Sequence, residues 1–208
     1  ETYNTFGCQN LAEKLESGLP AGHFGLLKLL AAEAKAQSLG IYIVGGFVRD
    51  LILSRPSLDF DVVIEGNAIE FAQALEAKYG GHAVKHGAFG TAKWQIATIH
   101  EALAELTAPG SDPQESELPE TIDLISARNE YYLEPAALPV VEPAGIKLDL
   151  RRRDFSINTL AVRLDPEHFG DCLDYWGGFN DLKEGLIRVL HALSFVDDAT
   201  RILRAVRF

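Results

Sequence analysis

The chain has 208 residues and a net charge of −11, and 47% of its residues are hydrophobic. This composition is typical of a globular protein with a sizeable core, and it excludes fibrous, low-complexity and disordered chains. The acidic balance argues against a domain that grips nucleic acid by itself, and the absence of a long apolar run or a signal peptide predicts a cytoplasmic protein without a membrane partner.

The first 53 residues predict a linker, a helix, a strand and a second helix. Residues 1–22 are polar and contain a Gly-Leu-Pro break, which is typical of a linker or the tail of a preceding region. Apolar residues at helical spacing predict a helix over 24–38 with Gly40 as its C-cap. We expect a buried strand over 41–44, then a Gly-Gly turn, and a short helix over 47–53.

Strands and helices alternate through the middle of the chain. Asn67, with Glu70 three residues later, resembles a capping box and predicts the start of a helix. The stretch 100–120 has six acidic side chains and no Lys or Arg, which indicates a solvated surface excursion. Strands are predicted over 59–64, 82–85, 91–97 and 121–126.

The last third of the chain predicts a connection followed by a smaller extension. Residues 129–146 hold three prolines, so we expect an extended, mobile connection between the strand of Asp123 and the arginines at 151–153. A helix is predicted over 154–162, a hairpin-like region over 163–190, and a final helix from about Asp197. These elements predict an α/β (α+β) domain over 23–162, followed by a small helical or mixed extension over 163–208. The chain lacks methionine and ends within a helix pattern, so we expect a piece of a longer protein.

Three aspartates are candidate metal-binding or catalytic residues. Asp59 and Asp61 are two apart on a predicted strand, which places both carboxylates on one face about 6.6 Å apart along the strand. Two such carboxylates suit a pair of divalent cations that drive phosphoryl transfer. Asp123 lies between aliphatic residues on another predicted strand and supplies a third carboxylate. Surface positions, helix caps and an edge strand are the alternative interpretations.

A glycine turn and an arginine cluster are candidates for binding a nucleotide. Gly45 and Gly46 let backbone N–H groups approach a phosphate, and Arg49 can reach a triphosphate oxygen. A plain tight turn is the alternative. In the second segment Asp154 and Asn158 are four residues apart, where they can hydrogen-bond a ribose or a base, while the adjacent arginines suit phosphate. A surface salt-bridge cluster is the alternative there.

The other polar patterns predict no site. Arg201, Arg204 and Arg207 lie opposite Leu203 and Val206, which is typical of an amphipathic helix with a solvated basic face. The six histidines lack metal-ligand spacing. The two cysteines at positions 8 and 172 are too few for a disulfide framework or a four-thiolate zinc site, so we expect ordinary buried or half-buried thiols.

The motifs taken together resemble one family. They are Ile-Val-Gly-Gly-Phe-Val-Arg-Asp (43–50), Leu-Asp-Phe-Asp-Val-Val (58–63), His-Gly-Ala-Phe-Gly-Thr-Ala (86–92), Arg-Arg-Asp-Phe-Ser-Ile-Asn-Thr-Leu-Ala (152–161), Trp-Gly-Gly-Phe-Asn-Asp-Leu (176–182) and Thr-Arg-Ile-Leu-Arg-Ala-Val-Arg-Phe (200–208). In this order they resemble the catalytic head of class II tRNA nucleotidyltransferases, the CCA-adding enzymes, and of bacterial poly(A) polymerases.

The resemblance implies a polymerase-β-like mixed sheet with flanking helices, followed by the start of a helical neck. It also implies a two-metal Mg²⁺ site, CTP or ATP as substrate, and the 3′ end of tRNA as acceptor. Its metal and catalytic positions match Asp59, Asp61 and Asp123. Its nucleotide-binding positions match Gly45, Gly46, Arg49, Arg153, Asp154, Asn158, Arg201 and Arg204.

The sequence departs from the family pattern at two positions, and it does not include the family's base-selecting motif. Asn158-Thr159 stands where Asn-Ala is usual, and Asp198-Ala199 where Asp-Pro is common. The family's base-selecting motif and tRNA-gripping regions lie beyond position 208, so we expect the chain alone to add nucleotides weakly or not at all. Addition of C, A or both to tRNA is the leading interpretation. A poly(A) polymerase and a non-catalytic nucleotide-binding module are the alternatives.

Overall fold

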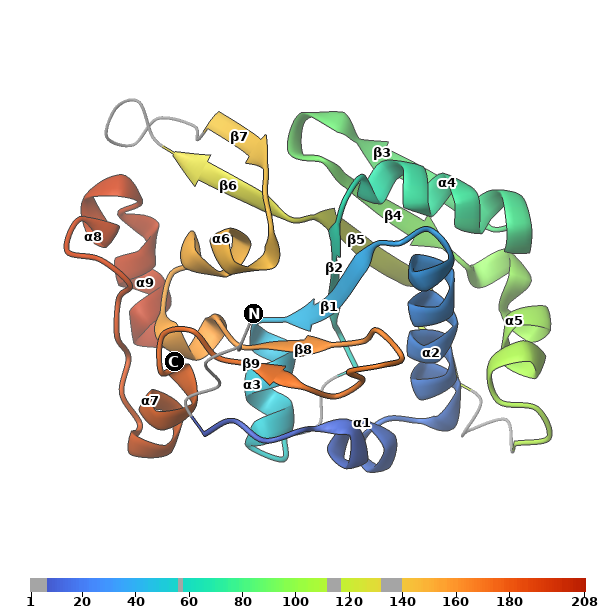
Figure 1. The fold of residues 1–208 in the computed structure, drawn as a ribbon, viewed down its shortest axis with the longest axis horizontal. Helices are drawn as coiled ribbons and strands as arrows, with labels where there is room; N and C mark the ends of the chain where they lie inside the picture. The colour runs from blue at the N-terminus through green and yellow to red at the C-terminus, as the bar shows by residue number, and fades with distance from the viewer. Residues whose placement is uncertain (1–6, 56–57, 112–116, 132–139) are drawn as a thin grey trace.

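The computed structural model describes residues 7–55, 58–111, 117–131 and 140–208. A mixed seven-stranded sheet organises them in the order β3-β4-β5-β2-β1-β8-β9 (Figure 1). Its strands are β1 (Gly40–Val44), β2 (Asp61–Glu65), β3 (His82–His86), β4 (Thr91–Gln95), β5 (Thr121–Ser126), β8 (Ala161–Arg163) and β9 (Cys172–Leu173). Only β2 and β5 pair in parallel among these described strands. The predicted mixed sheet with flanking helices is confirmed.

Helices cover the two faces of the sheet. They are α1 (Ala12–Gly18), α2 (Ala21–Ala36), α3 (Gly46–Ile52), α4 (Ala68–Tyr79), α5 (His100–Thr107), α6 (Ile146–Arg151), α7 (Gly178–Glu184), α8 (Ser194–Asp197) and α9 (Thr200–Arg207). Short 3₁₀ turns lie at η1 (Gly87–Phe89), η2 (Ala97–Ile99) and η3 (Ser156–Asn158). None of the helices in the described ranges is long and apolar enough to cross a membrane.

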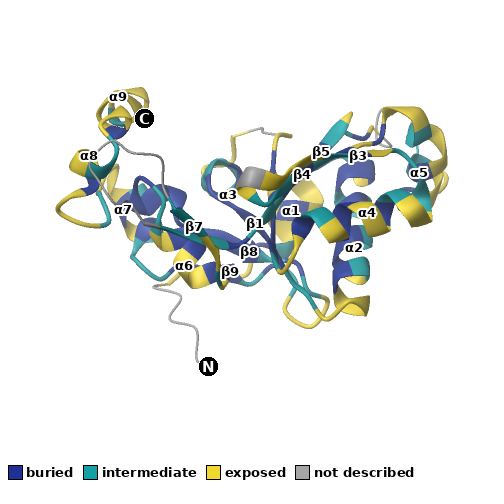
Figure 2. Ribbon diagram, turned by 90° about the horizontal axis from the view of Figure 1, so that it is seen from above, coloured by how far each residue is buried: buried dark blue, intermediate teal, exposed yellow. Residues whose placement is uncertain are grey.

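Side chains along the central strands point alternately to the two faces of the sheet, and this divides the core into two clusters. Ile41 and Ile43 point into the larger cluster, which α2 and α4 cover, because successive side chains on a strand face opposite sides of the sheet. Tyr42 and Val44 point into a smaller cluster that includes α6. Figure 2 shows the inner surfaces of α2 and α4 buried and their outer surfaces exposed. The burial of both faces of β1 holds the end of this strand, and the turn after it, in one place.

The N-terminal helices extend the larger cluster. Leu11 and Leu15, within the segment expected to be a linker or tail, are buried in it. Helix α2 begins at Ala21 and ends at Ala36, so Gly40 is the first residue of β1 and the prediction of a C-cap there is wrong. The Asn67 cap is confirmed, since its side chain accepts hydrogen bonds from the N–H groups of Ile69 and Glu70.

Two segments hold more regular structure than the sequence predicts. The described acidic side chains of 100–120 are exposed as expected, but the stretch contains α5, which packs against α2 and buries Leu103. The proline-containing segment 129–146 is extended where β6 (Arg128–Tyr131) and β7 (Val140–Pro143) pair as a separate two-stranded sheet. Residues 132–139 between them lie outside the described residues, so the predicted mobility of this connection stays a prediction.

The predicted helix over 154–162 is wrong. Helix α6 ends at Arg151, and the chain then forms η3 and the strand β8. Phe155 forms a bridge with Val189, and Ala161 pairs with both β1 and β9. These long-range backbone pairings replace the i to i−4 hydrogen bonds that a helix would make.

The prediction of two ordinary thiols is also wrong, because Cys8 and Cys172 form a disulfide. Both residues are buried. The segment around Cys8 lies along the β8–β9 hairpin, where Leu11 N–H donates to the carbonyl of Gly170 and Asn10 contacts Asp171. The N-terminal segment is therefore fixed to the edge of the main sheet.

Candidate active site

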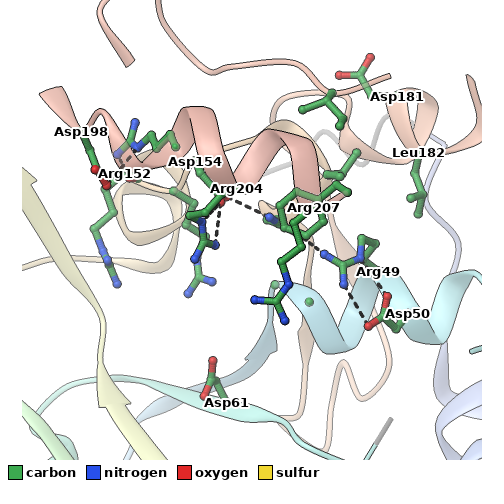
Figure 3. Close-up of a pocket in the computed structure, with 18 of the residues that line it drawn as sticks. Arg49, Asp50, Asp61, Arg152, Asp154, Asp181, Leu182, Asp198, Arg204 and Arg207 are labelled. Carbon is green, nitrogen blue, oxygen red and sulfur yellow. Dashed lines mark hydrogen bonds and ion pairs between the residues drawn. The ribbon is translucent and has the colours of Figure 1, made fainter. Parts of the chain in front are cut away.

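A cavity of about 1080 Å³ lies where β1, β2, η3 and α9 meet. Eight arginines and six acidic residues line it, and these are Arg49, Arg55, Arg128, Arg152, Arg153, Arg201, Arg204, Arg207, Asp50, Asp61, Glu130, Asp154, Asp181 and Asp198. Asp61 lies on one side of the cavity, and Arg204 and Arg207 of α9 lie on the other (Figure 3). A cavity with this lining suits an anionic ligand with a metal ion.

The predicted carboxylates lie at the start of β2 and on β5. Asp61 is paired in register with Asp123 across the parallel β2–β5 ladder. Asp59 precedes the strand, yet the alternation continues, because Asp59 and Asp61 are exposed and Phe60 between them is buried. The Phe60 ring packs edge-on against Phe47, with 5.6 Å between the ring centroids. The buried ring anchors the segment that presents both carboxylates.

The three carboxylates influence one another without forming a closed cluster. Asp59 lines one small cavity with Asp61 and another with Asp123. Partial desolvation raises the pKa of the Asp61 carboxyl, Arg153 opposes the rise, and the negative charges of Asp123 and Asp59 add to it. Within the described ranges, no three or more His, Cys, Asp or Glu side chains are grouped so that they could hold a metal ion.

The glycine turn brings the backbone against an arginine. Gly45 has a φ of +71°, a conformation that favours glycine, and a Cβ there would lie 2.8 Å from Nη1 of Arg153, so a larger residue would also push this side chain aside. The next residue, Gly46, begins α3. The Nε atom of Arg153 is buried and has no hydrogen-bond partner among the described residues. Arg153 therefore keeps a donor for an additional acceptor beside the turn.

A chain of polar contacts joins α9 to α3. Arg204 Nε donates to Asp154 Oδ2 at 2.7 Å, and Asn158 Nδ2 donates to Asp154 Oδ1 at 2.9 Å. Asn158 Oδ1 in turn accepts from Arg49 Nη1 at 2.8 Å, and Arg49 also forms an ion pair with Asp50. Burial opposes ionisation of Asp154, but the bonds from Asn158 and Arg204 outweigh it and lower its pKa. The predicted pair Asp154 and Asn158 thus makes contact, although the short 3₁₀ turn η3 rather than the predicted α-helix lies between them.

The faces of α9 agree only in part with the predicted amphipathic helix, since Arg204 and Arg207 are exposed as expected but Arg201 is not. Arg201 is buried, and it donates to Ser194 Oγ and to the carbonyl of Arg152. The apolar side chains of Leu203 and Val206 are 76% and 85% exposed, and α9 is exposed along much of its surface (Figure 2). All three arginines of the stripe line the cavity, and Arg204 and Arg207 are also exposed to solvent. Arg201 additionally positions α9 by its contacts within the protein.

A buried carboxylate that the sequence patterns did not predict organises the arginines. Asp149 is fully buried and accepts from Arg152 Nη2 at 2.7 Å and from Arg153 Nη2 at 3.1 Å. Burial raises the pKa of Asp149, but the charges of Arg153 and Arg152 outweigh this effect and lower it. Glu130 on β6 pairs with Arg152 from the other side. The spacing of three and four residues between Asp149 and the two arginines is the signal that could have identified it.

Comparisons with known proteins identify the family of the chain. Residues 41–188 match the family model described as the poly A polymerase head domain. The A-adding tRNA nucleotidyltransferase of Geobacter sulfurreducens is 43% identical over 91% of this chain, and that of Halalkalibacterium halodurans is 39% identical over 100% of it. The chain spans 19% and 44% of these two proteins.

Solved structures agree with the fold. The apo form II structure of a CCA-adding enzyme covers 96% of this chain at 41% identity with a TM-score of 0.82, and the chain covers 42% of that protein. The matched region includes β1, β2, β5 and η3, which carry the glycine turn, the carboxylates and the Asp154–Asn158 pair. The chain belongs to the poly A polymerase head domain family, with tRNA nucleotidyltransferases as its relatives.

Proposed function

We propose that this chain is the catalytic head of a protein that uses ATP to add adenosine to the 3′ end of tRNA. The observation that carries the proposal is the cavity in which Asp61 faces a glycine turn and a group of arginines. Carboxylates suit divalent cations, and arginines suit phosphate oxygens. The two A-adding relatives at 43% and 39% identity support adenosine over cytidine.

The acidic residues fit a magnesium site that is completed by the substrate. Mg²⁺ is commonly bound through one or two carboxylates together with substrate phosphates and water. Asp59 and Asp61 fit this pattern, since both are exposed at the start of β2 and the repulsion between them favours a cation. We assign the two-metal site to this pair, with Asp123 as the third catalytic carboxylate. When bound, Mg²⁺ neutralises the triphosphate and activates the attacking 3′ oxygen.

The remaining site residues bind and orient the nucleotide. We assign the triphosphate to the backbone of Gly45 and Gly46 and to Arg49 and Arg153, because Arg153 has an unpartnered buried donor beside the turn. Hydrogen bonds to bound phosphate would replace the present contacts of Arg49 with Asp50.

The ribose is assigned to Asp154 and Asn158. Their mutual hydrogen bond fixes the direction of each side chain, and the ion pair with Arg204 holds Asp154 in place. Arg201 has its own contacts within the protein, so we assign it the positioning of α9 rather than direct nucleotide binding.

The whole protein must supply further contacts. The first 146 residues carry 9 basic and 20 acidic side chains, and this surface alone is poorly suited to tRNA, because phosphate contacts dominate the affinity for nucleic acids. We propose that tRNA is gripped mainly outside this chain, in the cytoplasm, and that the site described above receives only its 3′ end.

Extension assays with defined tRNAs test the function. The whole protein is incubated with Mg²⁺, ATP and CTP and with tRNAs that end before, within or after the CCA sequence, and the products are sequenced. We expect one A on tRNA that ends in CC and no extension of unrelated RNA. Addition of C, long A tails on unrelated RNA, or nucleotide binding without transfer would each contradict the proposal.

A further inference from the structure

A lysine continues the row of carboxylates across the sheet. Lys93 on β4 is paired in register with Asp123 on β5, which is paired in register with Asp61 on β2. Residues paired in register project from the same face of a sheet, so the three side chains form a row. Lys93 Nζ lies 3.2 Å from Asp123 Oδ2, and the two side chains are 39% and 40% exposed.

Stability alone does not account for this ion pair. Ion pairs as exposed as this one contribute little to folding stability. The location of the pair is more informative, because Asp123 is the third carboxylate of the proposed site and Lys93 also acts on Asp61 through its charge. The lysine occupies the side of Asp123 away from Asp61. Its position is consistent with the finding that the described acidic side chains do not gather into a group of three.

We propose that Lys93 is a positioning residue that holds the Asp123 carboxylate in the metal-free protein and competes with a divalent cation for it. A doubly charged ion near Asp61 attracts Asp123 more strongly than one exposed ammonium group does. The pair therefore opens as the ion binds, and the lysine charge limits the affinity for the ion. This inference rests on the proposed function, because it needs a cation bound near Asp59 and Asp61.

Titration with Mn²⁺ alone tests the inference. Free Mn²⁺ is measured by electron paramagnetic resonance as the ion is added to the wild type and to Lys93→Gln, Lys93→Met and Lys93→Arg. Removing the charge is expected to tighten Mn²⁺ binding about fivefold in the Gln and Met variants, whereas the Arg variant stays within about twofold of wild type because it keeps the charge. Lys85→Gln on β3 is the matched control, since it removes the same charge away from Asp123, and we expect its affinity to be unchanged.

A double variant distinguishes the specific Lys93–Asp123 ion pair from a general effect of the lysine charge on the cation. In Asp123→Asn, the effect of Lys93→Gln on Mn²⁺ affinity is expected to fall to less than half of its size in the wild type, because the partner is gone. An undiminished effect would overturn the inference, and so would equal affinities of wild type and Lys93→Gln. A wild type that binds no Mn²⁺ would overturn the proposed metal site as well, whereas wild-type binding that is lost in Asp61→Asn supports that site whatever Lys93 does. Thermal unfolding without metal verifies that each variant is folded.

Discussion

Asp61→Asn is expected to lower nucleotide incorporation into tRNA by roughly a thousandfold or more in the whole protein. The change removes one negative charge and keeps the shape of the side chain. Because Asp61 is exposed and its charge is opposed by Asp59 and Asp123, the free energy of unfolding should stay the same or rise slightly. Incorporation of labelled ATP, measured together with urea unfolding, separates the lost chemistry from a lost fold.

Glu70→Gln is the control for this variant. Glu70 is exposed in the first turn of α4, outside the cavity, so its replacement removes an equal charge without touching the site. We expect it to retain nearly full incorporation. If Asp61→Asn kept more than about a tenth of the wild-type rate, the assignment of Asp61 to the metal site would be wrong.

Asp149→Asn is expected to lower the free energy of unfolding by about 3–5 kcal/mol. The change leaves the half-buried Arg152 and Arg153 beside a neutral group, and these arginines line the cavity proposed to bind the nucleotide. We therefore expect weaker ATP binding as well as lower stability. Glu167→Gln is the control, because Glu167 pairs with Lys35 at the surface, where solvent screens the pair and the loss of stability should be small.

The loss of stability in Asp149→Asn should depend on pH in a defined direction. The pKa of Asp149 is lowered in the folded protein, so its contribution to stability is present above the unfolded value of about 3.9 and is lost as pH falls toward the folded value. The difference in unfolding free energy between wild type and Asp149→Asn should therefore shrink as pH falls below about 4. A difference that stays constant down to pH 2 would contradict the buried ion pair.

Short-range patterns in the sequence were sufficient for the carboxylates and the glycine turn. Asp59, Phe60 and Asp61 alternate polar and apolar directly before a buried run, and this alternation persists in the structure although β2 begins only at Asp61. Gly45 follows an apolar strand and precedes a short helix, which left few conformations for the turn. In both places the neighbours in the chain are also the neighbours in space.

Features that depend on distant partners could not be predicted in this way. Cys8 and Cys172 are separated by 164 positions, and nothing near either residue indicates the pairing. The segment after Asp154 has apolar residues compatible with a helix, but its bridge to Val189 and its pairing with β1 decide the outcome. For α9 the periodicity predicts two faces, yet only the surroundings determine that Arg201 is buried and Val206 is exposed.

The most direct test of the central claim is a crystal structure with Mn²⁺ and a non-hydrolysable ATP analogue, because anomalous scattering locates the metal independently of the protein atoms. We expect the anomalous peak between the carboxylates of Asp59 and Asp61, with the triphosphate against Gly45, Gly46 and Arg153. Metal and triphosphate bound outside this cavity, with Asp61 free of contact to either, would contradict the account.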